Sequence, residues 1–250
     1  MTAGSLVPEC GARRRSTPCL PSQLPYDIDK LNQKSTATLG RPASRDLLWS
    51  PPPVAKSLVG ENHRVEPSLS RGESYERSYE LRAAAGEDVH GEANFVTRFS
   101  PGSVLDAGCG TGRVGRELHR RGVDVVGVDL DNEMLETARA RCPSASWIEG
   151  DISAIHLGRT FDIVLMAGNV INFVIPEFRR QALENLVHHL RPAGLLINGH
   201  SIRPEGCPPA VFSIWAEAAG LESVELWSTW DQDAFADSSD YALTVFRLRA

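Results

Sequence analysis

Long apolar runs are missing from this sequence. Of its 250 residues 42% are apolar, yet no stretch reaches the roughly 18 uninterrupted apolar residues that a membrane-spanning helix needs. The basic run Arg13–Arg15 is followed by no apolar segment, so it lacks the pattern of a secretory signal. We therefore expect a cytoplasmic protein that makes no use of a membrane.

Cysteines are few, and none are arranged as metal ligands. The five cysteines are odd in number and widely spaced, and no Cys-x-x-Cys pair or His/Cys cluster occurs: Cys10, Cys19, Cys109, Cys142 and Cys207. This pattern favours neither a zinc site nor a disulfide framework. We expect reduced thiols and no bound metal.

Positive charge is scarce in the larger part of the chain. Residues 71–250 hold 17 Lys and Arg against 26 Asp and Glu, a balance of −9, whereas residues 1–70 hold 9 against 6. A nucleic-acid-binding face normally needs an excess of basic residues. The balance therefore favours a small-molecule partner over DNA or RNA, and a cationic ligand over an anionic one.

Proline concentrates in the first 70 residues, which hold 9 of the 16 prolines and show no helical or strand periodicity. The few apolar residues there cannot offset the entropy lost on ordering such a segment. The sequence therefore predicts a disordered proline-rich extension over residues 1–70 and one folded domain over residues 71–250.

Strand and helix patterns alternate after two initial helices, which are predicted at Glu73–Ala85 and Glu87–Phe99. Pro176–Leu190 has the clearest helical stripe of apolar residues. Such alternation predicts an α/β fold with a doubly wound, mostly parallel sheet. The loop before the last strand is too short for a helical crossover, so that strand should be antiparallel. The seven predicted strands are Ser103–Asp106, Val123–Asp129, Ser146–Glu149, Phe161–Ala167, Leu195–Asn198, Leu221–Trp230 and Tyr241–Leu248.

A glycine-rich turn follows the first predicted strand, with Asp106 two residues before the first of three alternate glycines. Glycines at such a turn let the backbone approach a ligand closely. The range Gly110–Gly115 also has the G-x-G-x-x-G spacing of a dinucleotide site, and Asp129 follows at a workable distance for a ribose. The turn alone is thus equally consistent with an NAD(P)-dependent oxidoreductase.

Two more carboxylates bear on the choice of ligand. Asp106 would repel a pyrophosphate but could receive an ammonium group, and Asp151 follows the third predicted strand, where it could accept from an adenine amino group. Together with Asp129, three carboxylates around one ligand favour a cation. S-adenosylmethionine (SAM), which carries a sulfonium and an ammonium group, fits this pattern.

Residues 72–250 resemble the class I SAM-dependent methyltransferases, which have a Rossmann-like methyltransferase fold. The first motif of that family is present in full at Leu105–Gly112, and later motifs match in order at Val128–Leu130, Gly150–Ile152 and Phe161–Val164. The segments Gly86–Ala93 and Met166–Val170 resemble a small-molecule-methyltransferase-like subgroup common in actinobacteria.

The resemblance implies a role for each strand end. Asp106 and the glycines of the turn would hold the methionine part of the cofactor, Asp129 the ribose, and Leu130, Asp151 and Ile152 the adenine, with Ala167 beside the sulfonium. The implied cofactor-binding residues are Asp106, Gly108, Gly110, Gly112, Asp129, Leu130, Asp151, Ile152 and Ala167.

Two residues are candidates for catalysis. His200 follows the fifth predicted strand, where it could accept a proton from the acceptor, although a loop histidine with satisfied hydrogen bonds fits its position as well. Asn169 could orient the acceptor or simply form a turn. The expected activity is methyl transfer to an O, N or S atom of a small molecule; a non-catalytic cofactor-binding module is the remaining alternative.

Overall fold

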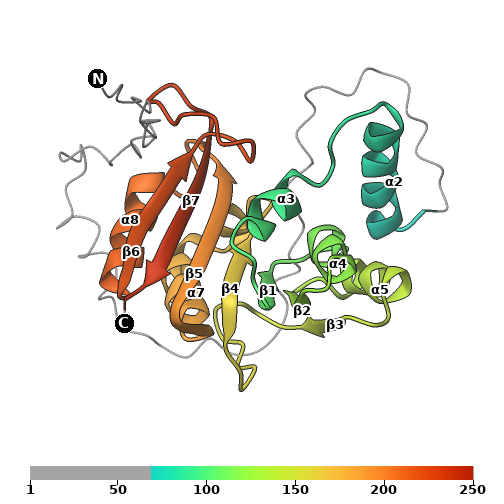
Figure 1. Cartoon of the computed structure of the whole chain (residues 1–250), viewed down its shortest axis with the longest axis horizontal. Coiled ribbons are helices and arrows are strands. Elements are labelled where there is room, and N and C mark those ends of the chain that lie inside the picture. Colours follow the sequence, from blue (N-terminus) through green and yellow to red (C-terminus); the bar gives the residue numbers. More distant parts are fainter. Residues whose placement is uncertain (1–68, 250) are drawn as a thin grey trace, which may run out of the picture.

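The structure, a computed structural model, describes residues 69–249. The predicted disordered extension over residues 1–70 therefore lies almost wholly outside the described residues. Within residues 69–249 the chain forms one seven-stranded sheet in the order β3-β2-β1-β4-β5-β7-β6, flanked by helices (Figure 1). Its strands are β1 Ser103–Ala107, β2 Asp124–Asp129, β3 Ser146–Glu149, β4 Phe161–Met166, β5 Leu190–Ser201, β6 Leu221–Trp227 and β7 Tyr241–Leu248.

Strand directions agree with the predicted fold class. Strands β3, β2, β1, β4 and β5 pair in parallel, whereas β7 runs antiparallel to both β5 and β6. The parallel strands bring their carboxyl ends to one edge of the sheet, and the order reverses between β1 and β4. Ligands of doubly wound sheets bind at such an edge.

Helices cover both faces of the sheet. One apolar cluster joins the sheet to α7 (Arg179–Val187) and α8 (Pro209–Ala218), and a second joins it to α3 (Gly91–Thr97) and α4 (Arg113–Arg120). A third cluster joins α5 (Asn132–Arg141) to Trp147 of β3. The central strand residues are buried on both faces, which explains their continuous apolar sequence.

The segment before α3 is not helical, although a helix was predicted from Glu87 to Phe99. The Asp88 carboxylate accepts a hydrogen bond from the His90 amide at 2.8 Å, and the helix begins only at Gly91. Aspartate side chains commonly compete with helix formation in this way. The predicted boundary was therefore wrong by four residues.

The predicted helix Pro176–Leu190 is divided. Pro176–Phe178 is a 3-10 turn, α7 ends at Val187, and Leu190 already belongs to β5, whose twelve residues far exceed the predicted four. The extra length arises at both ends, because Leu190 pairs with Phe161 and Ser201 pairs with Tyr241. A short helix, α6 (Val170–Phe173), was not predicted.

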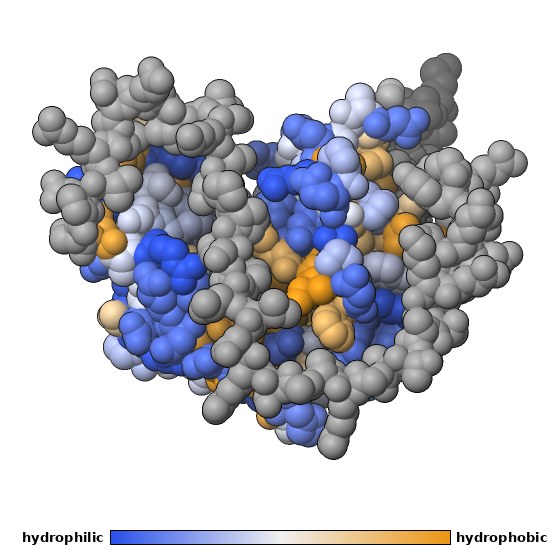
Figure 2. All heavy atoms as spheres, turned by 180° about the vertical axis from the view of Figure 1, so that it is seen from behind, coloured by the Kyte–Doolittle hydropathy of each residue, from blue (hydrophilic) through white to orange (hydrophobic). Residues whose placement is uncertain are grey.

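The first described helix, α2 (Arg71–Ala84), packs on α5 rather than on the sheet (Figure 1). Its two buried residues are Gly72 and Glu76. Figure 2 shows the opposite face of the molecule, where hydrophilic side chains predominate and the visible apolar ones form small separate groups. Among residues 69–249 no helix is both long and apolar enough to cross a membrane.

Candidate functional site

The glycine turn Gly108–Gly112 connects β1 to α4 and is fixed to the end of β2. The amides of Gly108 and Cys109 donate to the Val128 carbonyl at 2.7 and 3.0 Å. At Gly112 the backbone has a φ of 72°, and a Cβ atom there would lie 2.5 Å from the Trp147 ring. A side chain at Gly112 would therefore be strained and would also displace the ring.

Asp129, at the end of β2, is bound to the turn through its side chain. Its Oδ2 accepts from the Gly110 amide at 2.7 Å, and its Oδ1 accepts from the Asp131 amide at 2.9 Å. Burial raises the pKa of this carboxyl, and the backbone amides act in the opposite direction. Because each carboxylate oxygen has two lone pairs, both can accept a further hydrogen bond from a ligand.

Asp106 lies beneath the turn, with a side chain that is only 2% exposed. Its Oδ2 accepts from the Gly115 amide in the first turn of α4 at 3.1 Å. Burial raises the pKa of Asp106 to about 7, and the Gly115 amide and the Arg113 charge reduce that shift, whereas the Asp129 charge increases it. A positive group between Asp106 and Asp129 would favour the ionised form of both.

The end of β3 adjoins the end of β2, because the Gly150 amide donates to the Asp129 carbonyl at 2.9 Å. Asp151 is exposed and its Oδ1 accepts from the Ser153 amide, which leaves the other oxygen for a ligand. Leu130 is 61% exposed, whereas Ile152 is buried in the core. We call the glycine turn with Asp106, Asp129 and Asp151 the acidic edge.

The segment after β4 has an unusual backbone. Gly168 and Asn169 both have a positive φ, of 78° and 71°. The Asn169 Oδ1 accepts from the Ser201 amide at 2.6 Å, so this side chain connects the ends of β4 and β5. Ala167 is half-buried beside it. A role of Asn169 toward an acceptor stays a prediction, and its observed contact is with the backbone.

His200 does not have the position expected of a general base. It is fully buried, its Nε2 donates to the Cys207 carbonyl at 2.9 Å, and its Nδ1 accepts from the Asn198 amide group at 2.9 Å. Burial also lowers the pKa of His200. With both ring nitrogens engaged, the imidazole has no site for a substrate proton, which corrects the expectation of catalysis by His200.

An ion pair that the sequence did not reveal connects α3 to the start of α4. The Arg113 guanidinium binds both carboxylate oxygens of Glu92 and donates to the Val89 carbonyl at 2.6 Å, while its Cζ lies 4.1 Å from the centre of the Tyr79 ring. Arginine stacked on an aromatic ring and paired bidentately is strongly held in place. Arg113 directly follows the glycine turn, so this contact also restrains the turn.

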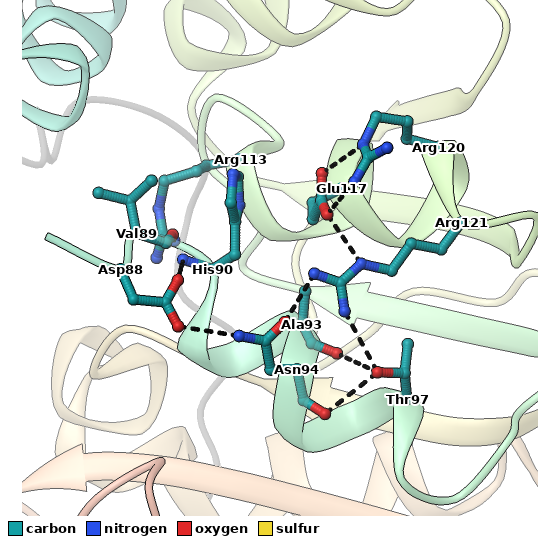
Figure 3. Close-up of polar contacts among 10 residues, drawn as sticks. All are labelled: Asp88, Val89, His90, Ala93, Asn94, Thr97, Arg113, Glu117, Arg120 and Arg121. Atoms are coloured by element: carbon teal, nitrogen blue, oxygen red, sulfur yellow. Dashed lines mark hydrogen bonds and ion pairs between the residues drawn. The ribbon is translucent and has the colours of Figure 1, made fainter. Parts of the chain in front are cut away.

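Further along the same helices, a second set of polar contacts keeps α3 against α4 (Figure 3). Arg121 donates to Asn94 Oδ1 at 2.7 Å, to Thr97 Oγ1 at 3.2 Å and to Glu117 at 2.7 Å. These bonds add to the apolar contacts of α3 with the sheet. Helix α3 is therefore attached by both kinds of interaction, unlike α2.

Comparison with known proteins gives consistent matches. Residues 104–194 match a family model described as a methyltransferase domain. The chain is 35% identical to a TehB-like SAM-dependent methyltransferase from Corynebacterium glutamicum, with a TM-score of 0.66 and coverage of 72% of this chain and 98% of that one. The segment 104–194 contains Asp106, Asp129 and Asp151, whereas α2 and His200 lie outside it.

Two curated relatives are named as sugar methyltransferases. The chain is 33% identical over 146 residues to a dTDP-3-amino-3,6-dideoxy-alpha-D-glucopyranose N,N-dimethyltransferase from Streptomyces fradiae, which covers 56% of this chain and 57% of that protein. It is 29% identical over 153 residues to a dTDP-3-amino-3,4,6-trideoxy-alpha-D-glucopyranose N,N-dimethyltransferase from Streptomyces venezuelae. This match covers 60% of this chain and 59% of that protein. The chain thus spans less than two thirds of the length of these curated relatives.

Proposed function

Because this chain belongs to the SAM-dependent methyltransferases, we propose that it transfers a methyl group from SAM to an O, N or S atom of a small molecule. The observation that carries the proposal is the acidic edge, where carboxylates lie at or just after the carboxyl ends of three neighbouring strands around one glycine turn. Three negative groups at one site favour a positively charged ligand.

The residues of the acidic edge fit SAM in chemistry. Asp106, whose pKa is raised by burial, would gain from a neighbouring ammonium group. Asp129 has lone pairs for two ribose hydroxyls, and Asp151 has a free oxygen for an amino group of adenine. The exposed Leu130 side chain offers an apolar surface for the adenine ring. These assignments are the ones that the resemblance to the family motifs implies.

When bound, SAM supplies a methyl group that its sulfonium already activates. The chain then needs mainly to align the acceptor and exclude water, without a dedicated triad. Ala167, Gly168 and Asn169 follow β4, next to the end of β1, and would adjoin the reacting groups. The bond from Asn169 to Ser201 would keep this segment in place during the reaction.

The side chains after β4 support a small acceptor with an apolar part. Three apolar side chains are exposed between the end of α6 and the start of α7: Phe173, Ile175 and Phe178. Both sugar methyltransferases named above act on compounds of low molecular weight, and the excess of acidic residues disfavours nucleic acid.

Free thiols at Cys109, Cys142 and Cys207 support a cytoplasmic location.

Calorimetric titration with SAM tests cofactor binding. We expect micromolar binding by the wild type and about a 100-fold higher Kd for Asp129→Asn, because hydrogen bonds to a charged group contribute about 1.5–3 kcal/mol each. Asp124→Asn, at the opposite end of β2, serves as the matched control and should bind normally. The absence of binding by the wild type at millimolar SAM would reject the proposal.

A labelled methyl donor tests transfer itself. Incubation of the protein with labelled SAM and a panel of amines, alcohols and thiols, including amino sugars, should yield a labelled product. Cofactor binding without transfer to any acceptor would instead indicate a non-catalytic binding module. Quenching of NADH fluorescence, with no response to SAM, would indicate an oxidoreductase.

A further inference from the structure

Helix α2 contacts the acidic edge although it buries little of its own surface. Gly72 lies so close to α5 that a Cβ atom there would lie 2.1 Å from the Thr137 hydroxyl. Near the same end, Arg71 forms ion pairs with Asp131 at 2.8 Å and with Glu133 at 2.9 Å. These two carboxylates directly follow the β2 end that carries Asp129, so α2 adjoins that side of the edge.

Glu76 is the one charged residue of α2 that is buried, with 4% of its surface exposed. Its Oε1 accepts a hydrogen bond from the Thr111 hydroxyl, and its Oε2 pairs with Arg116 at 2.6 Å and Arg141 at 3.3 Å. A buried carboxylate is tolerated only when its charge and lone pairs are satisfied. Glu76 has both arginines for its charge and Thr111 for its remaining lone pairs.

Thr111 places this contact inside the glycine turn. It lies between Gly110 and Gly112 and is fully buried. The turn is otherwise fixed by β2, through the Val128 carbonyl and the Asp129 side chain. Glu76 therefore adds a contact to the turn that does not come from β2, and it does so from a helix outside the sheet.

We propose that Glu76 is a positioning residue for cofactor binding, which acts through Thr111 to hold the glycine turn in its binding conformation. The role rests on the proposed function, because the turn is the proposed site of the methionine part of SAM. Glu76 does not act as a fourth charge for the cation, since Arg116 and Arg141 neutralise it. Its contribution is the fixed hydrogen-bond acceptor for Thr111.

Substitutions at both ends of the hydrogen bond test this role. Thr111→Val removes only the hydroxyl, and Glu76→Ala removes the acceptor. We expect each to raise the Kd for SAM about tenfold, near the lower end of the effect of one lost charge-assisted hydrogen bond, because the bond acts on the turn and not on SAM itself. The double variant should bind no more weakly than either single one, because both remove the same interaction. Thr111→Ser, which keeps the hydroxyl, should restore binding.

Glu80→Ala is the matched control on the same helix. Glu80 also binds Arg141, at 2.8 Å, but it makes no contact with Thr111. Both variants lose an ion pair between α2 and Arg141, but only Glu76→Ala also removes the acceptor for the Thr111 hydroxyl. Similar Kd values for Glu76→Ala and Glu80→Ala would therefore overturn the proposal, and a Kd increase confined to Glu76→Ala supports it.

Hydrogen exchange of the Gly110 and Gly112 amides gives a readout that does not depend on SAM. These amides donate to Asp129 and to the Cys109 carbonyl, so they report directly on the conformation of the turn. Faster exchange in Thr111→Val and Glu76→Ala supports the proposal, and unchanged exchange overturns it. Failure of the wild type to bind SAM would instead reject the proposed function and, with it, this role.

Discussion

The acidic edge and helix α2 lie side by side, but different forces hold them. The strands that carry the edge lie between two apolar clusters, whereas α2 has Gly72 and Glu76 as its buried residues and is attached mainly by charged side chains. Burial of one large apolar side chain stabilises by about 1.5–3 kcal/mol, while a partly exposed ion pair contributes about 0–1 kcal/mol. The strands that carry the edge should therefore stay folded when α2 does not, whereas the glycine turn would lose its contact with Glu76.

Because different forces hold the two regions, the acidic edge and α2 should respond to different solution conditions. Ion pairs such as Arg71–Asp131 weaken with salt, whereas apolar packing does not. The edge instead contains buried carboxylates, whose ionisation depends on pH. We therefore expect a change of pH to alter mainly the ionisation of the acidic edge. Added salt should weaken mainly the attachment of α2.

The largest expected effect concerns Asp106. Its pKa of about 7 in the folded protein lies above the usual 3.8, so between about pH 4 and pH 7 the folded state binds a proton that the unfolded state has released. The free energy of unfolding should consequently fall as the pH rises through this window, by on the order of 4 kcal/mol in total. Urea denaturation at a series of pH values measures this loss.

Asp106→Asn is the control for that measurement, because it has nearly the same shape but does not titrate. We expect the variant to lack the stability loss between pH 4 and pH 7. SAM should bind the wild type more tightly as the pH rises to about 7, because the cation prefers the ionised carboxylate. A stability curve that is the same in wild type and variant would exclude Asp106 as the titrating group.

A smaller effect is expected at Gly112, where backbone and packing both exclude a side chain. Gly112→Ala should cost about 3 kcal/mol, through the strain of a positive φ and the contact with Trp147. Gly122→Ala is the matched control: its φ is 88°, yet nothing lies within 4 Å of the added Cβ, so strain alone should cost about 1 kcal/mol. Urea denaturation measures the free energy of unfolding of both variants. Equal losses of stability would show that the contact with Trp147 adds nothing to the cost of a side chain at Gly112.

The sequence predicted the parts of the fold that local patterns of residues determine. All seven strands and their directions were predicted, because buried strands have continuous β-branched and apolar sequences bounded by glycine and proline. The four-residue prediction for β5 was too short because its ends depend on pairing with Phe161 and Tyr241. Pairing partners distant in sequence leave no local pattern.

Within the site, strand ends were predictable and side-chain contacts were not. Asp106, Asp129 and Asp151 lie at or just after the carboxyl ends of strands whose direction was predicted, so their common edge followed from topology. His200 was expected on that edge because β5 was thought to end at Asn198; the strand continues, and the side chain is directed into the core against Phe212. Glu76 was missed because its partners lie 35 or more residues away.

The smallest expected effect concerns the start of α2. Ser70 Oγ accepts from the Glu73 amide at 3.2 Å, and Glu73 accepts from the Ser70 amide at 2.9 Å, a reciprocal cap. Ser70→Ala should destabilise α2 by about 1 kcal/mol. Since α2 shares little apolar surface with the core, this loss should appear as faster hydrogen exchange of α2 amides, with the urea midpoint of the whole domain unchanged.

Ser78→Ala, inside the same helix, is the control for Ser70→Ala. The Ser78 hydroxyl donates only to the Tyr75 carbonyl, and alanine is the better helix former, so α2 amides should exchange no faster than in the wild type. A urea midpoint that shifts in Ser70→Ala by the full 1 kcal/mol would show that α2 unfolds together with the sheet. In that case apolar and charged contacts would stabilise one cooperative unit, and α2 could not open while the acidic edge stays formed.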